Sequence, residues 1–316
     1  MAKIVFWSQW ASTPGSGVAA ALPDDVVVKI SDENDLSPAA DAEIAFCGTT
    51  TDRMRKLLGA ARKLRWFHTP SAGVDRFLDI PDFRERKIIL TNNSGSYDIQ
   101  IAEHVMAFIF AAGKGLHLYR DKQHRSEWKD EEQHELRGET VVVYGAGSIG
   151  AEVVRLASAV GMRVIAVRRS GGPVPGAARV VGPQALSDVA GEADYLVVAA
   201  PLTPATRGAV SRDVIARLKK SAWVINIARG PIIDEPALID ALGAGRIGGA
   251  ALDTFDREPL PAESPLWKLP NVIITPHSSN RSPKVRERTL ALFVENVRRY
   301  KAGEPLLNQV NFEAGY

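Results

Sequence analysis

Residues 141–150 read VVVYGAGSIG, and this stretch decides the fold. The apolar run at 141–144 is typical of a buried strand, the glycines follow at the spacing G-x-G-x-x-G, and residues 151–160 continue with a helical pattern. A strand, a glycine-rich turn and a helix in this order are the fingerprint of a dinucleotide-binding βαβ unit. The alternative is a glycine turn that serves only packing, but the strand and helix around it favour a binding site.

Each glycine of the fingerprint has a physical task. Gly145 permits a tight turn, Gly147 lets a pyrophosphate approach the backbone, and Gly150 lets the helix pack close to the strand. The first turn of the helix adds free N–H groups and a partial positive charge, which suit a phosphate. The predicted cofactor-binding residues of this loop are Gly145, Gly147, Ser148, Ile149 and Gly150.

Apolar strand-like runs alternate with helical patterns along the chain, which predicts parallel α/β sheets. The first series of runs is 3–7, 26–30, 43–47, 64–68 and 88–91, and the second is 141–144, 163–167, 195–199, 223–227, 248–252 and 272–275. One long helix over 99–118 connects the two series, and a helix over 284–300 returns the chain to the first. We therefore predict two Rossmann-like or flavodoxin-like domains with an interdomain cleft. A substrate-binding domain (1–98 plus 283–316) contains an inserted dinucleotide-binding domain (99–282).

Composition restricts the class of protein. With 316 residues, 45% of them hydrophobic and 24% charged, the chain fits a two-domain globular protein rather than a disordered or fibrous one. The formal net charge is only +2, so nucleic acid is not an expected partner. The single cysteine, Cys47, excludes an intrachain disulfide, and no metal motif is present. No signal-peptide pattern or apolar run of about 18 residues occurs, so we expect a cytoplasmic protein without membrane contact.

The end of the next predicted strand indicates which dinucleotide is bound. NAD sites usually place Asp or Glu there, whereas this chain carries Arg168, Arg169 and Ser170. Two guanidinium groups and a hydroxyl suit the 2′-phosphate of NADP(H), which an acidic residue would repel. We predict that NADP(H) is preferred and that NAD(H) is also accepted. The alternative is that both arginines are a solvated surface pair.

Three polar residues follow strands of the second series, where open α/β sheets bind ligands. Reduction of a 2-keto acid needs a cation for the carboxylate, a proton donor for the developing alkoxide, and a group that keeps the donor protonated. Arg229, His277 and Glu258 fill these roles in that order. Singly, they read as a surface arginine, a capped core histidine and an exposed glutamate. Their joint occurrence at strand ends of a dinucleotide fold favours catalysis.

Nearly the whole chain resembles the D-isomer-specific 2-hydroxyacid dehydrogenases, a family that includes glyoxylate/hydroxypyruvate reductases. The motifs that carry the resemblance are Ser71-Ala72-Gly73-Val74-Asp75, Glu103-His104, the glycine fingerprint, Pro201-Leu202-Thr203-Pro204-Ala205-Thr206, Ala228-Arg229-Gly230, Asp253 with Glu258-Pro259-Leu260, and Pro276-His277. Two departures stand out. Ser278-Ser279-Asn280 replaces the usual apolar-then-glycine sequence after the histidine, and Arg168 stands where many members carry Asp.

The resemblance implies a role for each matching residue. Arg229 binds the substrate carboxylate, His277 is the general acid and base, and Glu258 pairs with it. Asp253 faces the nicotinamide carboxamide. Further expected contacts are Pro201, Thr206 and Ala228 for the cofactor, and the backbone of Ala72, Gly73 and Val74 for the substrate carboxylate. The resemblance also implies a homodimer, for which we expect the helix at 99–118 and the arm at 119–135 to supply the contact, with Trp128 as an anchor.

Several alternatives stay open at this point. A relative acting on phosphoglycerate, phosphite or formate is one, although formate enzymes pair the histidine with Gln rather than with Glu258. A non-catalytic dinucleotide-sensing protein of the same fold is another. The physiological 2-keto acid is not given by the sequence, because the candidate contacts Trp7, Ser8, Tyr97 and Trp267 could equally be packing residues.

Overall fold

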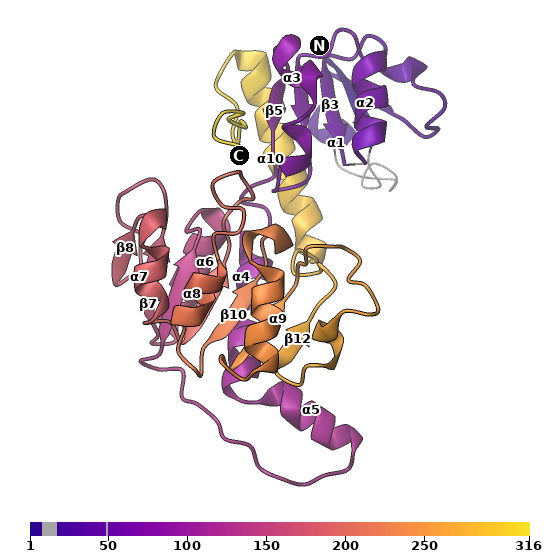
Figure 1. Ribbon diagram of the computed structural model, residues 1–316. Helices are drawn as coiled ribbons and strands as arrows, with labels where there is room; N and C mark the ends of the chain where they lie inside the picture. Colours follow the sequence, from indigo (N-terminus) through magenta and orange to yellow (C-terminus); the bar gives the residue numbers. More distant parts are fainter. Residues whose placement is uncertain (8–17, 49) are drawn as a thin grey trace. The chain divides into compact units, whose positions relative to one another are not determined.

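The computed structural model of the chain describes residues 1–7, 18–48 and 50–316. The chain divides into two compact units, Met1–Tyr97 with Ser282–Tyr316 and Asp98–Arg281 (Figure 1). Each unit is built on a parallel sheet with helices on both faces, so the predicted pair of parallel α/β sheets is confirmed. The assignment of one unit to the substrate and the other to the dinucleotide stays a prediction.

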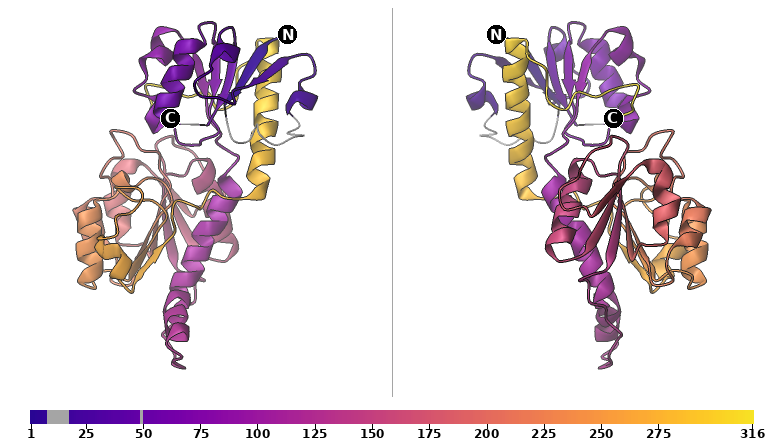
Figure 2. Two further views of the ribbon diagram at one scale, coloured as in Figure 1. Left: turned by 90° about the vertical axis from the view of Figure 1, so that its right-hand side faces the viewer. Right: turned by 90° about the vertical axis from the view of Figure 1, so that its left-hand side faces the viewer.

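The first unit contains a five-stranded parallel sheet in the order β2-β1-β3-β4-β5. Its strands are β1 (Lys3–Trp7), β2 (Val26–Lys29), β3 (Ile44–Cys47), β4 (Trp66–His68) and β5 (Ile89–Thr91). Its helices are α1 (Val18–Ala21), α2 (Thr51–Ala60), α3 (Pro81–Glu85) and α10 (Pro283–Ala302), with short 3-10 turns η2 (Ser37–Ala39) and η3 (Asp75–Phe77). The apolar faces of α2 and α3 cover one side of this sheet, and α1 and α10 cover the other (Figure 2).

The C-terminal helix α10 is part of the core of the first unit. Ser282 caps its start, with its hydroxyl accepting from the N–H of Lys284, and Gly303 ends it in the left-handed conformation. Between these ends α10 inserts Phe293, whose ring lies edge-on to Phe6 and Phe46 at 5.3 and 5.1 Å between centroids. Residues at the two ends of the chain therefore share one hydrophobic cluster.

The second unit contains a seven-stranded parallel sheet in the order β12-β11-β10-β9-β6-β7-β8. Its strands are β6 (Thr140–Tyr144), β7 (Arg163–Val167), β8 (Arg179–Val181), β9 (Tyr195–Val198), β10 (Trp223–Asn226), β11 (Gly249–Leu252) and β12 (Val272–Ile274). Its helices are α4 (Asp98–Gly113), α5 (Leu116–His124), α6 (Ser148–Ala159), α7 (Leu186–Ala190), α8 (Arg212–Arg217) and α9 (Glu235–Gly243), with 3-10 turns η4 (Pro183–Ala185), η5 (Gly230–Ile232) and η6 (Pro265–Lys268).

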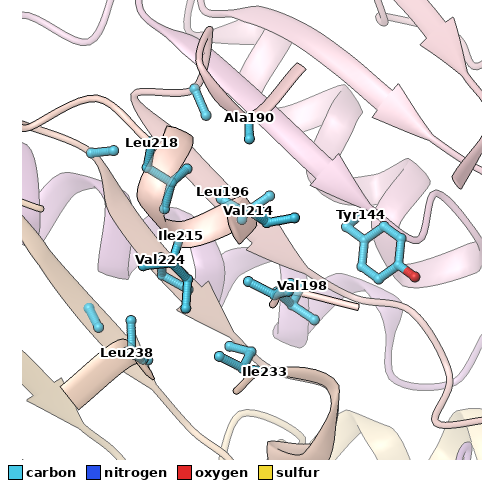
Figure 3. Packing of buried hydrophobic residues seen from close by; sticks show 14 of the residues in the cluster. Tyr144, Ala190, Leu196, Val198, Val214, Ile215, Leu218, Val224, Ile233 and Leu238 are labelled. Carbon is cyan, nitrogen blue, oxygen red and sulfur yellow. The ribbon is translucent and has the colours of Figure 1, made fainter. Parts of the chain in front are cut away.

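The helices of the second unit form two layers. Helices α4 and α6 pack together on one face of the sheet, and α7, α8 and α9 cover the other. Figure 3 shows the second interface, where Val214 and Ile215 of α8 lie beside Leu196 of β9, and Leu238 of α9 lies nearer to Val224 of β10. Strands β6 and β9 are buried on both faces, which explains their nearly continuous apolar sequence.

Two sequence predictions need correction. The single helix expected over 99–118 is two helices, because α4 ends at Gly113 and Gly115 adopts a left-handed conformation with φ of 60° before α5 begins. Strand β8 is absent from the predicted set, because its three residues are only half-buried and carry no recognisable apolar period.

The strand order places the site. The chain runs from β6 outward through β7 to β8, then returns to β9 on the other side of β6. Because all pairings are parallel, the loops that follow the strands emerge at one edge, and the order reverses between β6 and β9. Such a switch point is where open α/β sheets bind ligands.

Among the helices of the described residues, none combines the length and apolar character needed to cross a membrane.

A fully buried histidine lies in the first unit at the end of β4. Thr91 Oγ1 accepts from Trp66 Nε1 at 2.8 Å and also forms a hydrogen bond of 2.8 Å with His68 Nδ1. Burial lowers the pKa of His68 from 6.5 to about 3, because the charged ring would have to leave water. His68 is therefore neutral in the folded protein and charged in the unfolded chain below about pH 6.5.

We expect the free energy of unfolding to fall between about pH 6.5 and pH 4, because only the unfolded chain binds a proton at His68 in this range. The contribution is about 1.4 kcal/mol per pH unit. Urea unfolding at several pH values measures it. His68→Leu should remove this part of the pH dependence, whereas His124→Leu at an exposed site should leave it unchanged. If the free energy of unfolding depended on pH equally in the wild type and in His68→Leu, this would contradict a buried neutral ring.

Candidate active site

The glycine fingerprint forms the turn between β6 and α6. Gly145 has φ of 103°, and a Cβ on it would lie 2.3 Å from the backbone N of Ala200. A Cβ on Gly150 would lie 2.1 Å from the carbonyl oxygen of Gly145. Gly147, in contrast, has no atom within 4 Å of its Cβ position. Two glycines thus close the turn, and the third leaves the backbone open at the start of α6, where a phosphate group can approach.

The loop after β7 contains a preorganised cation. Arg168 Nε and Nη2 donate to Ser170 Oγ at 3.0 and 2.7 Å, while its backbone N–H donates to the carbonyl of Val181 in β8. Arg169 is exposed beside it. The structure brings the three predicted residues of this loop together on the strand that neighbours the glycine turn.

The loop after β9 folds on itself. Thr206 Oγ1 donates to the carbonyl of Pro201 at 2.6 Å and accepts from the N–H of Thr203 at 2.8 Å. This hydroxyl is therefore engaged in shaping the 201–206 turn. The expected contacts of Pro201 and Thr206 with the cofactor stay predictions.

The loop after β10 presents Arg229. Asn226, buried at the strand end, braces it: its Oδ1 accepts from the N–H of Ala228 at 3.0 Å, and its Nδ2 donates to the carbonyl of Arg229 at 3.1 Å. Arg229 Nη1 donates to the carbonyl of Ala228 at 2.7 Å. Asn226 is therefore a positioning residue of this loop that the sequence analysis did not predict; its place as the last residue of a buried strand was the available signal.

Gly230 joins this loop to the loop after β11. A Cβ at Gly230 would lie 1.9 Å from the carbonyl carbon of Phe255 and 2.2 Å from the N of Asp256. The two backbones therefore touch, and only glycine fits between them. The loop that carries Arg229 and the loop that carries Glu258 are held at a fixed separation by this contact.

His277 and Glu258 form a hydrogen-bonded pair. His277 Nδ1 lies 2.7 Å from Glu258 Oε2, and Glu258 Oε1 accepts from the backbone N–H of Phe255 at 3.0 Å. The two side chains are 38% and 35% exposed, so the imidazole remains open to a ligand. A carboxylate fixed at one end and bonded to Nδ1 at the other orients the ring and leaves Nε2 as the nitrogen that can exchange a proton with a substrate.

Asp253 is bonded to the loop that carries His277. Its side chain is fully buried. One carboxylate oxygen accepts from Thr275 Oγ1 and the N–H of Ser278, and the other accepts from the N–H of Ser279. The described contacts of Asp253 are thus with the loop of His277, and a contact with the cofactor stays a prediction.

The remaining candidates are described within their own units. In the first unit, Val74 is buried, Ala72 and Gly73 are half-buried, and Asn92 Nδ2 donates to the carbonyl of Ala72 at 3.0 Å. Of the candidate substrate contacts, Trp7 and Tyr97 are buried and Trp267 is half-exposed; Ser8 lies outside the described residues. Trp7 and Tyr97 are thus packed within the first unit, and their contact with a substrate stays a prediction.

A pocket of about 520 Å³ lies among the loops that follow β9, β10 and β11. Its lining includes Arg207, Pro231, Glu235 and Asp256, but none of the three predicted catalytic residues. Burial raises the pKa of Glu235, and its Oε2 accepts from the N–H of Asp256 at 3.0 Å. Glu235 thus helps to hold the turn that carries Glu258. In the part of the chain that the structure describes, no three His, Cys, Asp or Glu side chains are arranged to hold a metal.

Comparison with known proteins places the chain in a family. Residues 106–279, more than half of the chain, match the family model "D-isomer specific 2-hydroxyacid dehydrogenase, NAD binding domain". The chain belongs to the D-isomer specific 2-hydroxyacid dehydrogenases. It is accordingly an NAD(P)-dependent oxidoreductase, and its second unit carries the region that matches the NAD-binding domain.

Two solved structures and one curated relative illustrate the similarity. A D-isomer specific 2-hydroxyacid dehydrogenase from Xanthobacter autotrophicus Py2, in complex with NADPH and MES, is 29% identical with a TM-score of 0.87, covering 100% of this chain and 99% of that one. An NADPH-dependent glyoxylate/hydroxypyruvate reductase from Sinorhizobium meliloti, in complex with NADP and sulfate, is 28% identical with a TM-score of 0.86, covering 100% of both chains. A D-3-phosphoglycerate dehydrogenase from Methanocaldococcus jannaschii is 33% identical over 91% of this chain, which spans only 55% of that relative.

The contact between His277 and Glu258 yields a prediction about turnover. Glu258→Gln keeps the size of the side chain but replaces the carboxylate that orients the imidazole, so kcat for a keto acid should fall roughly tenfold or more. The measurement is kcat at saturating substrate and cofactor.

The matched control is Glu263→Gln, which removes a carboxylate from an exposed position near the same loop. It should leave the kcat of the wild type unchanged. A kcat close to wild type in Glu258→Gln or in His277→Ala would contradict the roles given to these residues.

Proposed function

We propose that the protein is an NADP(H)-preferring reductase of small 2-keto acids, with a D-2-hydroxy acid as product and glyoxylate or hydroxypyruvate as the first candidate substrates. The observation that carries the proposal is the His277–Glu258 pair, 2.7 Å apart, on the same sheet edge as Arg229 and the glycine turn. A proton donor and a cation for the carboxylate are the groups that reduction of a 2-keto acid requires of the protein.

The glycine turn fits a dinucleotide. The open backbone at Gly147 and the start of α6 would hold the pyrophosphate, with Ser148 and Ile149 in the first helical turn. When bound, the nicotinamide would supply or accept the hydride. The expected neighbours Ala228 and Asp253 lie at the ends of β10 and β11 along the same edge.

The preference for NADP(H) rests on the loop after β7. Arg168 is already held by Ser170, so little side-chain entropy remains to be lost when its guanidinium meets a phosphate. Arg169 adds a second positive charge. The two solved relatives described in complex with NADPH and with NADP support this preference, and NAD(H) remains a second cofactor.

Arg168→Asp should reverse or abolish the cofactor preference. The wild type should use NADPH with a kcat/KM roughly ten- to a hundredfold above that for NADH, since a charge-assisted hydrogen bond contributes about 1.5 to 3 kcal/mol. Steady-state kinetics with both cofactors measures the ratio. Arg246→Asp, a charge reversal at an exposed position preceding β11 at the opposite edge, should leave the ratio unchanged. Equal use of both cofactors by the wild type would contradict the proposal.

Arg229 is proposed to bind the substrate carboxylate and to orient the carbonyl. Its loop is fixed at two points, by the Asn226 side chain and by the contact at Gly230, so the guanidinium starts from a defined position. The backbone of Ala72, Gly73 and Val74 is proposed as a second contact for the carboxylate on the strength of the family resemblance. His277 then serves the carbonyl oxygen, which leaves one face of the carbon for hydride.

A panel of 2-keto acids, from glyoxylate to branched and aromatic ones, tests the proposal with NADPH and NADH. We expect turnover of the small members and, by chiral analysis where the product has a stereocentre, a D-hydroxy acid. Arg229→Ala should raise KM and lower kcat together, because one guanidinium serves both binding and orientation. An L-product, or no turnover with any keto acid, would overturn the assignment.

Phosphoglycerate oxidation is the second candidate because of the 33% identical relative that acts as a D-3-phosphoglycerate dehydrogenase. Adding D-3-phosphoglycerate and NAD to the substrate panel distinguishes keto-acid reduction from phosphoglycerate oxidation.

A homodimer is part of our proposal as well. Its support is the segment of α5 and residues 125–135, which extends away from the seven-stranded sheet and leaves Leu116 and Trp128 exposed (Figure 1).

A further inference from the structure

His277 has a backbone conformation that a histidine rarely adopts. Its φ is 49°, in the left-handed region, where residues other than glycine are uncommon. Its backbone N–H donates to the carbonyl of Thr275 at 3.0 Å, which closes a tight turn around Pro276. A strained conformation of this kind persists only where neighbouring groups determine it.

Asp253 supplies such groups on both sides of His277. Its Oδ1 accepts from Thr275 Oγ1 at 2.5 Å and from the N–H of Ser278 at 2.8 Å, and its Oδ2 accepts from the N–H of Ser279 at 3.1 Å. The carboxylate is fully buried, so these donors replace water. One side chain at the end of β11 therefore fixes the residues before and after the histidine.

The network continues into α4 through His104. His104 Nε2 lies 3.2 Å from Thr275 Oγ1, whose only proton is committed to Asp253. Nε2 must therefore carry a proton and donate it to the threonine oxygen. Burial lowers the pKa of His104, and the negative charge of Asp253 opposes this effect only in part. The lowered pKa favours a neutral ring, which is then protonated on Nε2. Phe108, one turn further along α4, packs edge-on against this ring, with 4.4 Å between the ring centroids.

Gln100 makes the corresponding contact at the far end of the loop. It lies four residues before His104, on the same face of α4, and its Nε2 donates to the carbonyl of Asn280 at 3.2 Å. One helical face thus holds the loop at Thr275 and again at Asn280. The sequence pattern did not reveal this, because Gln100, His104 and Thr275 are far apart along the chain.

We propose that Thr275, together with Asp253 and His104, is a positioning network that keeps His277 in its left-handed conformation and its Nδ1 on Glu258. The proposal rests on the proposed function, in which His277 exchanges a proton with the substrate. The ring is held from both directions: Glu258, itself bonded to the N–H of Phe255, fixes Nδ1, and the network fixes the backbone from which the ring projects. Thr275 and His104 act through His277 and need not touch the substrate.

Thr275→Val tests the network, because it removes the hydroxyl and keeps the shape of the side chain. We expect kcat for a keto acid to fall roughly tenfold or more, since small misplacements of a catalytic group are costly, while the KM for NADPH changes less than twofold. Thr275→Ser, which restores the hydroxyl, should recover most of kcat. The matched control is Thr254→Val, since Thr254 Oγ1 is buried without a hydrogen-bond partner in the described structure. The control should stay within twofold of the wild type.

A second readout does not depend on turnover. Histidine ring-nitrogen NMR of the protein with NADPH should show His104 as a neutral ring protonated on Nε2. Thr275→Val should shift the ring signals of both His104 and His277, the latter identified by their loss in His277→Ala, whereas Thr254→Val should shift neither. If Thr275→Val does not fold, His104→Leu takes its place and should lower kcat and shift the His277 signals in the same way.

Two outcomes would overturn the network: wild-type kcat together with unshifted His277 signals in the variant, or a His104 ring protonated on Nδ1 alone. Equal losses of kcat in Thr275→Val and Thr275→Ser would also count against it, because the hydroxyl would then be irrelevant. If the wild type reduces no keto acid, the proposed function fails. The NMR comparison still decides whether the network positions His277.

Discussion

Parallel pairing of the seven strands in the second unit is the constraint on which the site depends. In a parallel sheet every strand ends at the same edge, so loops far apart in sequence emerge side by side. The glycine turn follows β6, Arg168 follows β7, Arg229 follows β10 and His277 follows β12. None of these residues is close to another along the chain, and only the sheet gathers them.

Polar side chains at the buried strand ends then convert flexible loops into fixed ones. Asn226 braces the Arg229 turn, and Asp253 braces the His277 turn. Each is the last residue of its strand or the first after it, so it points along the edge with backbone N–H groups within reach. A buried polar group costs free energy unless it is bonded, and the loop amides supply those bonds. At Gly230, direct contact between two backbones serves the same purpose without any side chain.

The sequence predicted those features of the fold that depend on patterns of neighbouring residues. Hydrophobic periodicity is local and strong, so the two parallel sheets were predictable, as was the glycine turn after β6. The break at Gly115 was missed, because apolar residues on both sides continued the helical pattern and a single glycine is often tolerated in a helix. Strand β8 was missed because three half-buried residues carry too little pattern.

The sequence by itself determined the class of protein, the glycine fingerprint, the arginines after β7 and the identities of Arg229, Glu258 and His277, because these are local motifs with a definite chemical meaning. The tertiary structure decided how those groups are held. It placed Glu258 Oε2 at 2.7 Å from His277, directed Asp253 to the loop amides, and brought His104 of α4 to Thr275 across 171 positions of sequence. Contacts at such separations depend on how the helices pack against the sheet, and no local pattern of residues encodes that geometry.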